Sequence, residues 1–193
     1  MNKKVFLACG AALFFSSSAL YASDDSHSIK VAASFSKSFT ISKGTAGGKD
    51  IDRMLKPNIF GTSIMFAPSS STDIGLELKY FANVDETNCF LGAASFRYLL
   101  GGADSTFTPY AKFSAGLYKP FLTDKGKDGL DPDEINNLEA FVAVSSAGLG
   151  LDFKITDSIY LTAGADLAIY GFKIRDHYEN PQLTLSVGAG FAF

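Results

Sequence analysis

The sequence predicts an all-β protein: an eight-stranded antiparallel up-and-down β-barrel whose strands cross a membrane. Three observations lead to this fold class. Apolar residues alternate with small or polar ones over eight stretches, and aromatic residues and glycine are abundant (18 Phe, 8 Tyr and 18 Gly). After the first 22 residues no apolar run reaches the roughly 18 residues of a helical span. A closed barrel then satisfies every backbone hydrogen bond inside lipid.

The clearest alternation lies in the last stretch, residues 183–193. Its apolar members are Leu183, Leu185, Val187, Ala189, Phe191 and Phe193. The residues between them are small or polar. This strict period of two predicts a strand with one apolar face, because a helix would scatter the same groups around its axis.

The first stretch has the features of a cleaved signal peptide. Lys3 and Lys4 precede an apolar run over residues 5–15, and small residues lead to a plausible cleavage site after Ala22. Cys9 lies inside the apolar run and lacks a lipoprotein motif before it. We therefore expect residues 1–22 to be removed and residues 23–193 to form one exported domain.

Charge and cysteine content narrow the function classes. Residues 23–193 hold all 20 acidic residues and 15 of the 17 basic ones, so their formal net charge is −5. No basic stripe is present, which argues against nucleic acid as a partner. Cys89 is the single cysteine left after cleavage. It is predicted to be a small apolar strand residue, with an intermolecular bridge as the alternative.

The first four predicted strands follow the closing one in pattern. The stretch over residues 29–41 is apolar on one face except for Lys37, which we expect near a membrane interface, where a lipid-facing cation costs least. In the third stretch Leu76 and Leu78 point outward, and Glu77 points inward. The four stretches are residues 29–41, 59–67, 73–81 and 89–100.

The remaining strands repeat the alternation. Phe113 and Leu117 oppose Lys112 and Ser114 in the fifth, and Asp166 lies on the small or polar face of the seventh. These four stretches are residues 106–118, 139–155, 158–172 and 183–193.

The connections between these stretches also suggest a barrel. They run to about 17, 5, 7, 5, 20, 2 and 10 residues, so the first, third, fifth and seventh connections are each longer than the connections beside them. The short ones at 68–71, 101–104 and 156–157 contain turn-forming residues. Short turns on one side and long loops on the other are typical of outer-membrane barrels, with both termini in the periplasm.

Aromatic residues fall where two interface girdles are expected. At the outer strand ends these are Tyr80, Phe81, Phe90, Phe121, Phe141, Tyr170 and Phe172. At the inner ends they are Phe107, Phe153, Phe191 and Phe193. The alternative is that these rings form the core of a soluble β-sandwich.

Several motifs resemble a known family. They are Phe-Thr-Pro-Tyr-Ala at 107–111, Ala-Gly-Leu at 115–117, Gly-Leu-Gly-Leu-Asp-Phe-Lys-Ile-Thr-Asp at 148–157, Ser-Ile-Tyr-Leu at 158–161, Ala-Asp at 165–166 and the terminal Phe193. Together they resemble the small porin-like eight-stranded barrels typified by outer-membrane proteins A, X and W.

The resemblance implies expectations about site and partners. The closing-strand residues Leu185, Val187, Ala189, Phe191 and Phe193 would serve as a signal to the barrel-assembly machinery. Outer-membrane lipid and lipopolysaccharide would surround the barrel, and surface loops would meet a host or environmental ligand. The likeness to outer-membrane protein W implies the alternative of a narrow pore for small or apolar solutes.

Charged residues on the inward faces form the main candidate site: Glu77, Lys79, Arg97, Lys112, Asp152, Lys154 and Asp166. A barrel of eight strands is only wide enough for its side chains to fill, so buried charges there must pair. We expect Glu77–Arg97 and Asp166–Lys112 pairs. The network acts either as a stabilising plug or as the filter of a gated pore.

The longest connection contains a calcium-loop candidate formed by Asp124, Asp128, Asp131, Asp133 and Glu134. Alternating carboxylates with a glycine suit calcium, but Gly126 replaces a ligand and Glu134 arrives one position early. These departures favour a solvated acidic turn, and no metal or other cofactor is predicted.

No nucleophile and base motif accompanies His177 or His27, so the sequence favours a protein that is not an enzyme. The glycine-rich segment 43–49, with Lys56 beyond it, is predicted to be a surface loop.

Overall fold

The computed structural model describes residues 28–40, 45–46, 49–50, 58–84, 87–101, 105–170 and 182–193. The expected signal peptide, Cys9, both histidines, Phe172 and most of the glycine-rich loop lie outside these ranges. Eight long strands form the barrel: β1 (Ser28–Thr40), β4 (Asn58–Ser69), β5 (Thr72–Val84), β6 (Thr87–Leu99), β7 (Phe107–Leu122), β8 (Val142–Lys154), β9 (Ile159–Tyr170) and β10 (Gln182–Ala192). The predicted fold class is confirmed.

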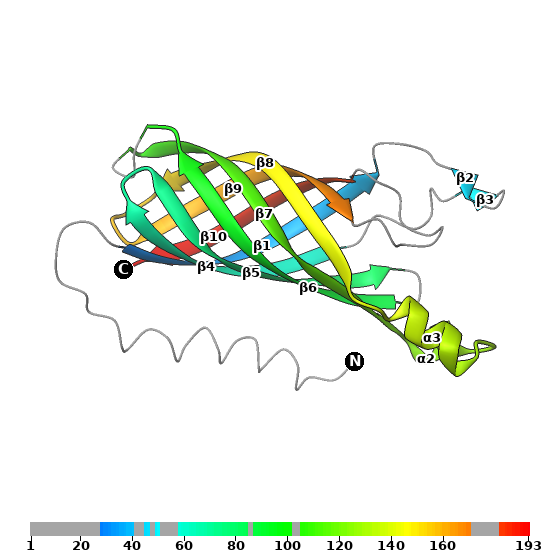
Figure 1. Cartoon of the computed structure of the whole chain (residues 1–193). Coiled ribbons are helices and arrows are strands. Elements are labelled where there is room, and N and C mark those ends of the chain that lie inside the picture. Colours follow the sequence, from blue (N-terminus) through cyan, green and yellow to red (C-terminus); the bar gives the residue numbers. More distant parts are fainter. Residues whose placement is uncertain are drawn as a thin grey trace.

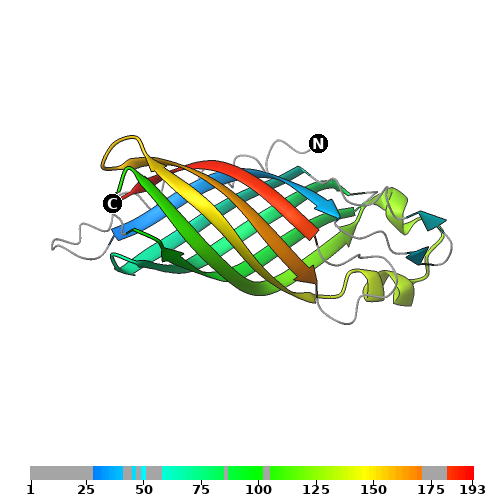
Figure 2. The same ribbon diagram turned by 90° about the horizontal axis from the view of Figure 1, so that it is seen from above.

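The barrel closes between its first and last strands. Each strand pairs antiparallel with its neighbours in the chain, and β10 pairs with β1 over eleven register positions from Lys30–Ala192 to Thr40–Gln182. Phe193 N donates to Ile29 O and Ile29 N donates to Phe193 O, at 2.9 and 3.1 Å. Ser28 and Phe193 therefore lie at one end, which we call the terminal end (Figures 1 and 2).

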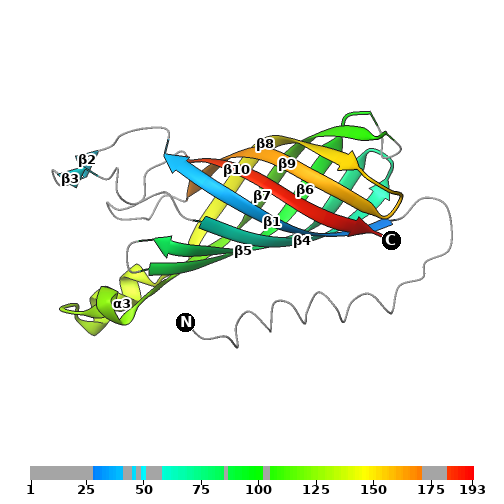
Figure 3. The same ribbon diagram turned by 180° about the vertical axis from the view of Figure 1, so that it is seen from behind.

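The opposite end, called here the loop end, carries two short helices, α2 (Asp124–Lys127) and α3 (Pro132–Leu138). They follow the end of β7, which is the longest strand, and contact it (Figure 3). Two strands of two residues each, β2 (Thr45–Ala46) and β3 (Lys49–Asp50), pair antiparallel in the region of the predicted glycine-rich loop. Among the described residues, no helix has the length and apolarity needed to cross a membrane.

The strands are two-faced as predicted. Leu76 and Leu78 are 63% and 60% exposed on the outer surface, whereas Asp73 and Glu77 on the same strand are buried. The closing-strand residues Leu185, Val187, Ala189, Phe191 and Phe193 all lie on the exposed outer face of β10 and its end. Most of the large apolar residues thus lie on the outside of the barrel, which is the inverse of a soluble sandwich.

One girdle residue was wrongly placed. Phe81 is only 4% exposed, and its ring packs edge-on against the Tyr118 ring at 5.4 Å inside the barrel. The reason is parity: Phe81 follows Lys79 on the inward face of β5, so it cannot share a surface with Tyr80. Phe90, Phe121 and the inner-end Phe107 are exposed as expected.

The alternation of connection lengths was also only partly correct. The β5–β6 connection is residues 85–86, shorter than the β6–β7 connection at 100–106. The strands continue to a Val84–Thr87 pair across a register shift after Phe81. The predicted sixth strand began too early, because Glu139 is the C-cap of α3 and β8 starts at Val142.

Candidate functional site in the barrel interior

The interior holds two groups of paired charges. The first group, nearer the terminal end, consists of Lys30, Asp73, Arg97 and Asp152. Lys30 Nζ lies 2.9 Å from Asp73 Oδ2, and Arg97 Nη1 lies 3.8 Å from the same oxygen. Arg97 Nη2 donates to Asp152 on the far side of β7. The fully buried Asp73 is therefore shared by two cations.

The ring of Tyr110 packs against the guanidinium group of Arg97. The guanidinium carbon lies 3.6 Å from the centroid of the Tyr110 ring, and the ring hydroxyl is 3.2 Å from Thr162 Oγ1. The ring lies over Gly150, its register partner on β8, where a Cβ would overlap it. Gly150 therefore makes room for the aromatic platform that holds the arginine.

The second group lies next to the first, further toward the loop end, and consists of Glu77, Lys79, Lys112 and Asp166. Lys112 Nζ lies 2.6 Å from Asp166 Oδ2 and 3.3 Å from Glu77 Oε1, and Lys79 Nζ lies 2.9 Å from Glu77 Oε2. Lys112 and Asp166 are on β7 and β9, with Gly148 of β8 between them in register. A Cβ at Gly148 would overlap the Asp166 carboxylate, so this glycine lets the two charges meet.

The two groups are balanced in charge. Four cationic side chains, Lys30, Lys79, Arg97 and Lys112, face four carboxylates, Asp73, Glu77, Asp152 and Asp166. Arg97 and Lys112 are directly opposite each other on β6 and β7. Their repulsion is offset because each also reaches a carboxylate on another strand. Removing one member of such a pair would leave an uncompensated charge inside the barrel, which is costly.

The predicted charge set is partly reproduced. The Asp166–Lys112 pair is present. The prediction of a Glu77–Arg97 pair is wrong, because the β5–β6 register places Arg97 opposite Asp73 and Glu77 opposite Ala93. Lys154 lies outside both groups, where it pairs with the exposed Asp157 at 3.0 Å.

Lys30 and Asp73 were not in the predicted network. Both fall on the inward positions of their strands, so the same alternation that identified the others could have identified them.

The half of the interior nearest the loop end is less charged. An apolar layer fills one side, formed by Ile59, Phe81, Cys89, Leu91, Ala93, Tyr118, Val144 and Ala168. Cys89 is fully buried there and accepts from the Tyr118 hydroxyl at 2.5 Å. On the other side Ser38 bonds to Gln182 Oε1 and Thr184 Oγ1, at 3.1 and 3.2 Å.

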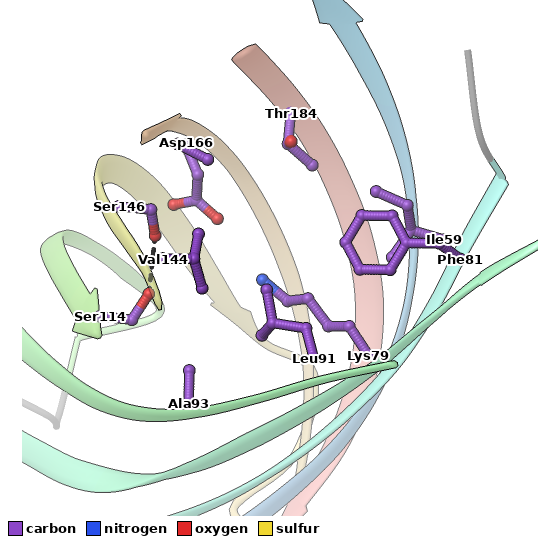
Figure 4. A pocket seen from close by; sticks show the side chains of 11 residues that line it. Ile59, Lys79, Phe81, Leu91, Ala93, Ser114, Val144, Ser146, Asp166 and Thr184 are labelled. Carbon is purple, nitrogen blue, oxygen red and sulfur yellow. Dashed lines mark hydrogen bonds between the residues drawn. The ribbon is translucent and has the colours of Figure 1, made fainter. Parts of the chain in front are cut away.

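The described side chains of the interior border two cavities. One, of about 30 Å³, is bordered by apolar-layer residues and by Lys79 and Asp166, which point toward it from different strands (Figure 4). The other, of about 60 Å³, is lined by members of both charge groups and by Ser34, Ser36 and Ser186. A water needs at least about 10–15 Å³ of such space, so each cavity has room for only a few waters.

The calcium-loop candidate is built as a helix start. Asp131 Oδ1 accepts from Glu134 N at 2.9 Å, and Glu134 Oε2 accepts from Asp131 N at 3.3 Å, with Pro132 in the first turn. The sequence signal was Asp-Pro-Asp-Glu, a capping box with proline at the first helical position. No group of three or more His, Cys, Asp or Glu among the described side chains could hold a metal ion.

Glu139 fastens the helical connection to the barrel. Its Oε1 accepts from Leu122 N at 3.0 Å and lies 3.3 Å from Lys127 Nζ. Partial burial raises the pKa of this carboxyl, but the bonds from Leu122 N and Lys127, with the charges of Lys127 and Lys119, lower it further, so the net pKa is below its ordinary value.

Comparison with known proteins places the fold. No protein-family model and no curated protein sequence matches the chain. The N-terminal β-barrel domain of OprF from Pseudomonas aeruginosa matches with a TM-score of 0.60 at 18% identity, over 86% of this chain and 97% of that one. Neisserial surface protein A (NspA) matches with a TM-score of 0.59 at 15% identity, over 86% of this chain and 97% of that one. OprG from Pseudomonas aeruginosa matches with a TM-score of 0.58 at 12% identity, over 87% of this chain and 96% of that one.

These likenesses extend over nearly the whole of each solved chain. Together with the closed sheet and its apolar exterior, they show that this chain has the fold of the small eight-stranded outer-membrane β-barrels. The resemblance inferred from its strand motifs is thereby confirmed at the level of the fold.

Proposed function

We propose that the chain is a bacterial outer-membrane protein with a structural and surface-interaction role, carried out by the elements at its loop end. The fold shared with OprF, NspA and OprG supports this location. So does the apolar outer surface, which suits lipid and would be costly in water. The first 22 residues would direct export and be removed.

The observation that carries this proposal is the filled interior. Eight balanced charges and an apolar layer occupy it, and the two cavities hold only a few waters. The loop end, by contrast, carries a folded connection with exposed Leu138 and Phe141. A host or environmental ligand would therefore meet the loops and not the interior. This role is non-enzymatic and needs no cofactor.

The partners follow from the same placement. The outer face of β10, with Phe191 and Phe193 at the terminal end, would present the assembly signal to the barrel-assembly machinery in the periplasm. Lipopolysaccharide and other outer-membrane lipid would contact the rest of the outer wall.

The alternative is a narrow pore, favoured by the charge-lined 60 Å³ cavity. Conductance of the refolded protein in a planar lipid bilayer separates the two. We expect no conductance steps, because opening a path would break ion pairs that have low exposure to solvent. Defined steps that change in Glu77→Ala or Arg97→Ala would instead assign a pore with these charges as its filter.

A further inference from the structure

The lipid-facing wall of the barrel carries charge at only two of the side chains that the structure describes. On the eight strands these are Lys37 of β1 and Lys119 of β7. The residues two positions before and after each lysine are exposed and apolar, so each lysine lies on the outer face of its strand. Each is the third residue before the loop-end limit of its strand, which is Thr40 for β1 and Leu122 for β7. The described outer wall thus has cations, without carboxylates, at one end.

Lys119 stands within a group of aromatic rings. Its Nζ lies 4.6 Å from the ring centroid of Phe141 and 5.4 Å from that of Phe121. Its register partner on β6 is Phe90, whose ring packs edge-on against Phe121 at 5.8 Å. Girdles of aromatic residues flank the apolar band of an outer-membrane barrel at both interfaces, so these rings place Lys119 at an interface.

Lys37 has a similar setting. Phe35 and Phe39, two positions before and after it, are 43% and 39% exposed on the same face. Its Nζ donates to Asn58 Oδ1 at 3.1 Å, at the first residue of β4. An ammonium group has three hydrogens, so this bond leaves donors available.

Neither ammonium pairs with a carboxylate within the described part of the chain. The charge of Lys119 acts on Glu139, but that carboxylate is bonded to Leu122 N and Lys127. A lipid-facing lysine is much more costly at mid-bilayer than near the interface. Both lysines therefore sit where their cost is low and where anionic headgroups are found.

We propose that Lys37 and Lys119 each bind a phosphate group of an anionic lipid in the outer leaflet, the class to which lipid A belongs. This inference rests on the proposed outer-membrane location, with the loop end outward. The ammonium supplies charge and hydrogen bonds to the phosphate, and the flanking rings pack against the upper acyl chains.

The two contacts are separate sites. Around the closed sheet β1 and β7 are four strands apart in either direction, so they lie on opposite sides of the barrel. Figure 1 shows β7 on the near side, and Figure 3, turned by 180°, shows β1 there. One lipid cannot reach both, and the stoichiometry is two.

Native mass spectrometry of the refolded full barrel, released from micelles containing diphosphorylated lipid A, tests the proposal. We expect the wild type to retain two lipid A molecules above background, Lys37→Gln and Lys119→Gln to retain one each, and the double variant none. Lys125→Gln, an exposed lysine of α2, is the matched control and should retain two. Lys119→Arg should also retain two.

Dephosphorylated lipid A should be retained at background level by every variant. The inference is overturned if the double variant, folded and inserted in vesicles, retains as much lipid A as the wild type. It is also overturned if the wild type retains dephosphorylated lipid A as well as it retains the diphosphorylated form. Failure of the wild-type chain to insert into vesicles at all would overturn the proposed function, and this inference with it.

Discussion

At the scale of single residues, the interior depends on side chains that are shared between strands. Asp73 is fully buried and contacts both Lys30 and Arg97, and Arg97 in turn reaches Asp152 over the ring of Tyr110. Gly148 and Gly150 provide the room for these contacts. Removing one partner leaves an uncompensated charge in a site with little water, which is far more costly than losing a surface pair.

Asp73→Asn is therefore expected to lower the free energy of unfolding by about 3–5 kcal/mol. The measurement is a urea titration of the refolded protein in lipid vesicles, followed by far-UV circular dichroism. Asp157→Asn is the matched control, because its carboxylate is fully exposed beside Lys154 and its loss should leave stability nearly unchanged. The double variant Lys30→Met with Asp73→Asn should recover part of the loss. Equal stability of Asp73→Asn and the control would contradict the charge-sharing account.

At the scale of elements, the β7–β8 connection is organised by helix caps. Thr123 caps α2, Asp131 caps α3, and Gly129, with a φ of 82°, makes the turn between them in a conformation that favours glycine. Glu139 then joins the end of α3 to both Leu122 and Lys127. Asp124, Asp131, Asp133 and Glu134 thus lie at helix starts, and Glu139 forms an ion pair with Lys127.

The lowered pKa of Glu139 makes the stability of this connection depend on pH. Because the folded-state pKa is lowered, the carboxylate stabilises the docked helices above its ordinary pKa of about 4.3, and the stabilisation is lost as the pH falls through the folded-state value. At pH 7 Glu139→Gln should speed hydrogen exchange of the Leu122 amide about threefold to tenfold, the effect of a bond of about 1 kcal/mol.

Exchange followed by NMR from pH 7 to 3, corrected for intrinsic rates, tests this element. The wild-type amide should approach the variant's rate only below about pH 4.3. Asp133→Asn is the control, because the exposed Asp133 is not part of the Glu139 contact. Equal exchange in the wild type and Glu139→Gln at pH 7 would show that Glu139 does not hold the connection.

At the scale of the whole molecule, closure of eight strands places both barrel termini at one end and the helices at the other. An outer-membrane orientation with periplasmic termini then puts α3 outside the cell. The apolar outer wall and the filled interior follow from the same closure, since each strand turns one face to lipid and one face inward.

Labelling of intact cells with a membrane-impermeant maleimide checks the orientation. Asn136→Cys on α3 should react fully, because this position is exposed, whereas Cys89 is fully buried and should contribute little background. Asp157→Cys, exposed in the turn at the terminal end, should react only after the outer membrane is permeabilised. The opposite pattern would reverse the orientation and remove the proposed role of the loop end.

The sequence by itself determined which face of each strand turns inward, because alternation is a local property with a period of two. It therefore identified the barrel, most of its lipid-facing residues and six of the eight paired inward charges. Phe81 was misplaced because its assignment to the outer girdle did not follow the alternation of its strand. The tertiary structure decided the partners of those charges. Arg97 meets Asp73 and Asp152, and Lys112 meets Asp166 across Gly148, because strand register brings them together. Register arises from closure of the whole sheet, a nonlocal constraint that no single strand contains.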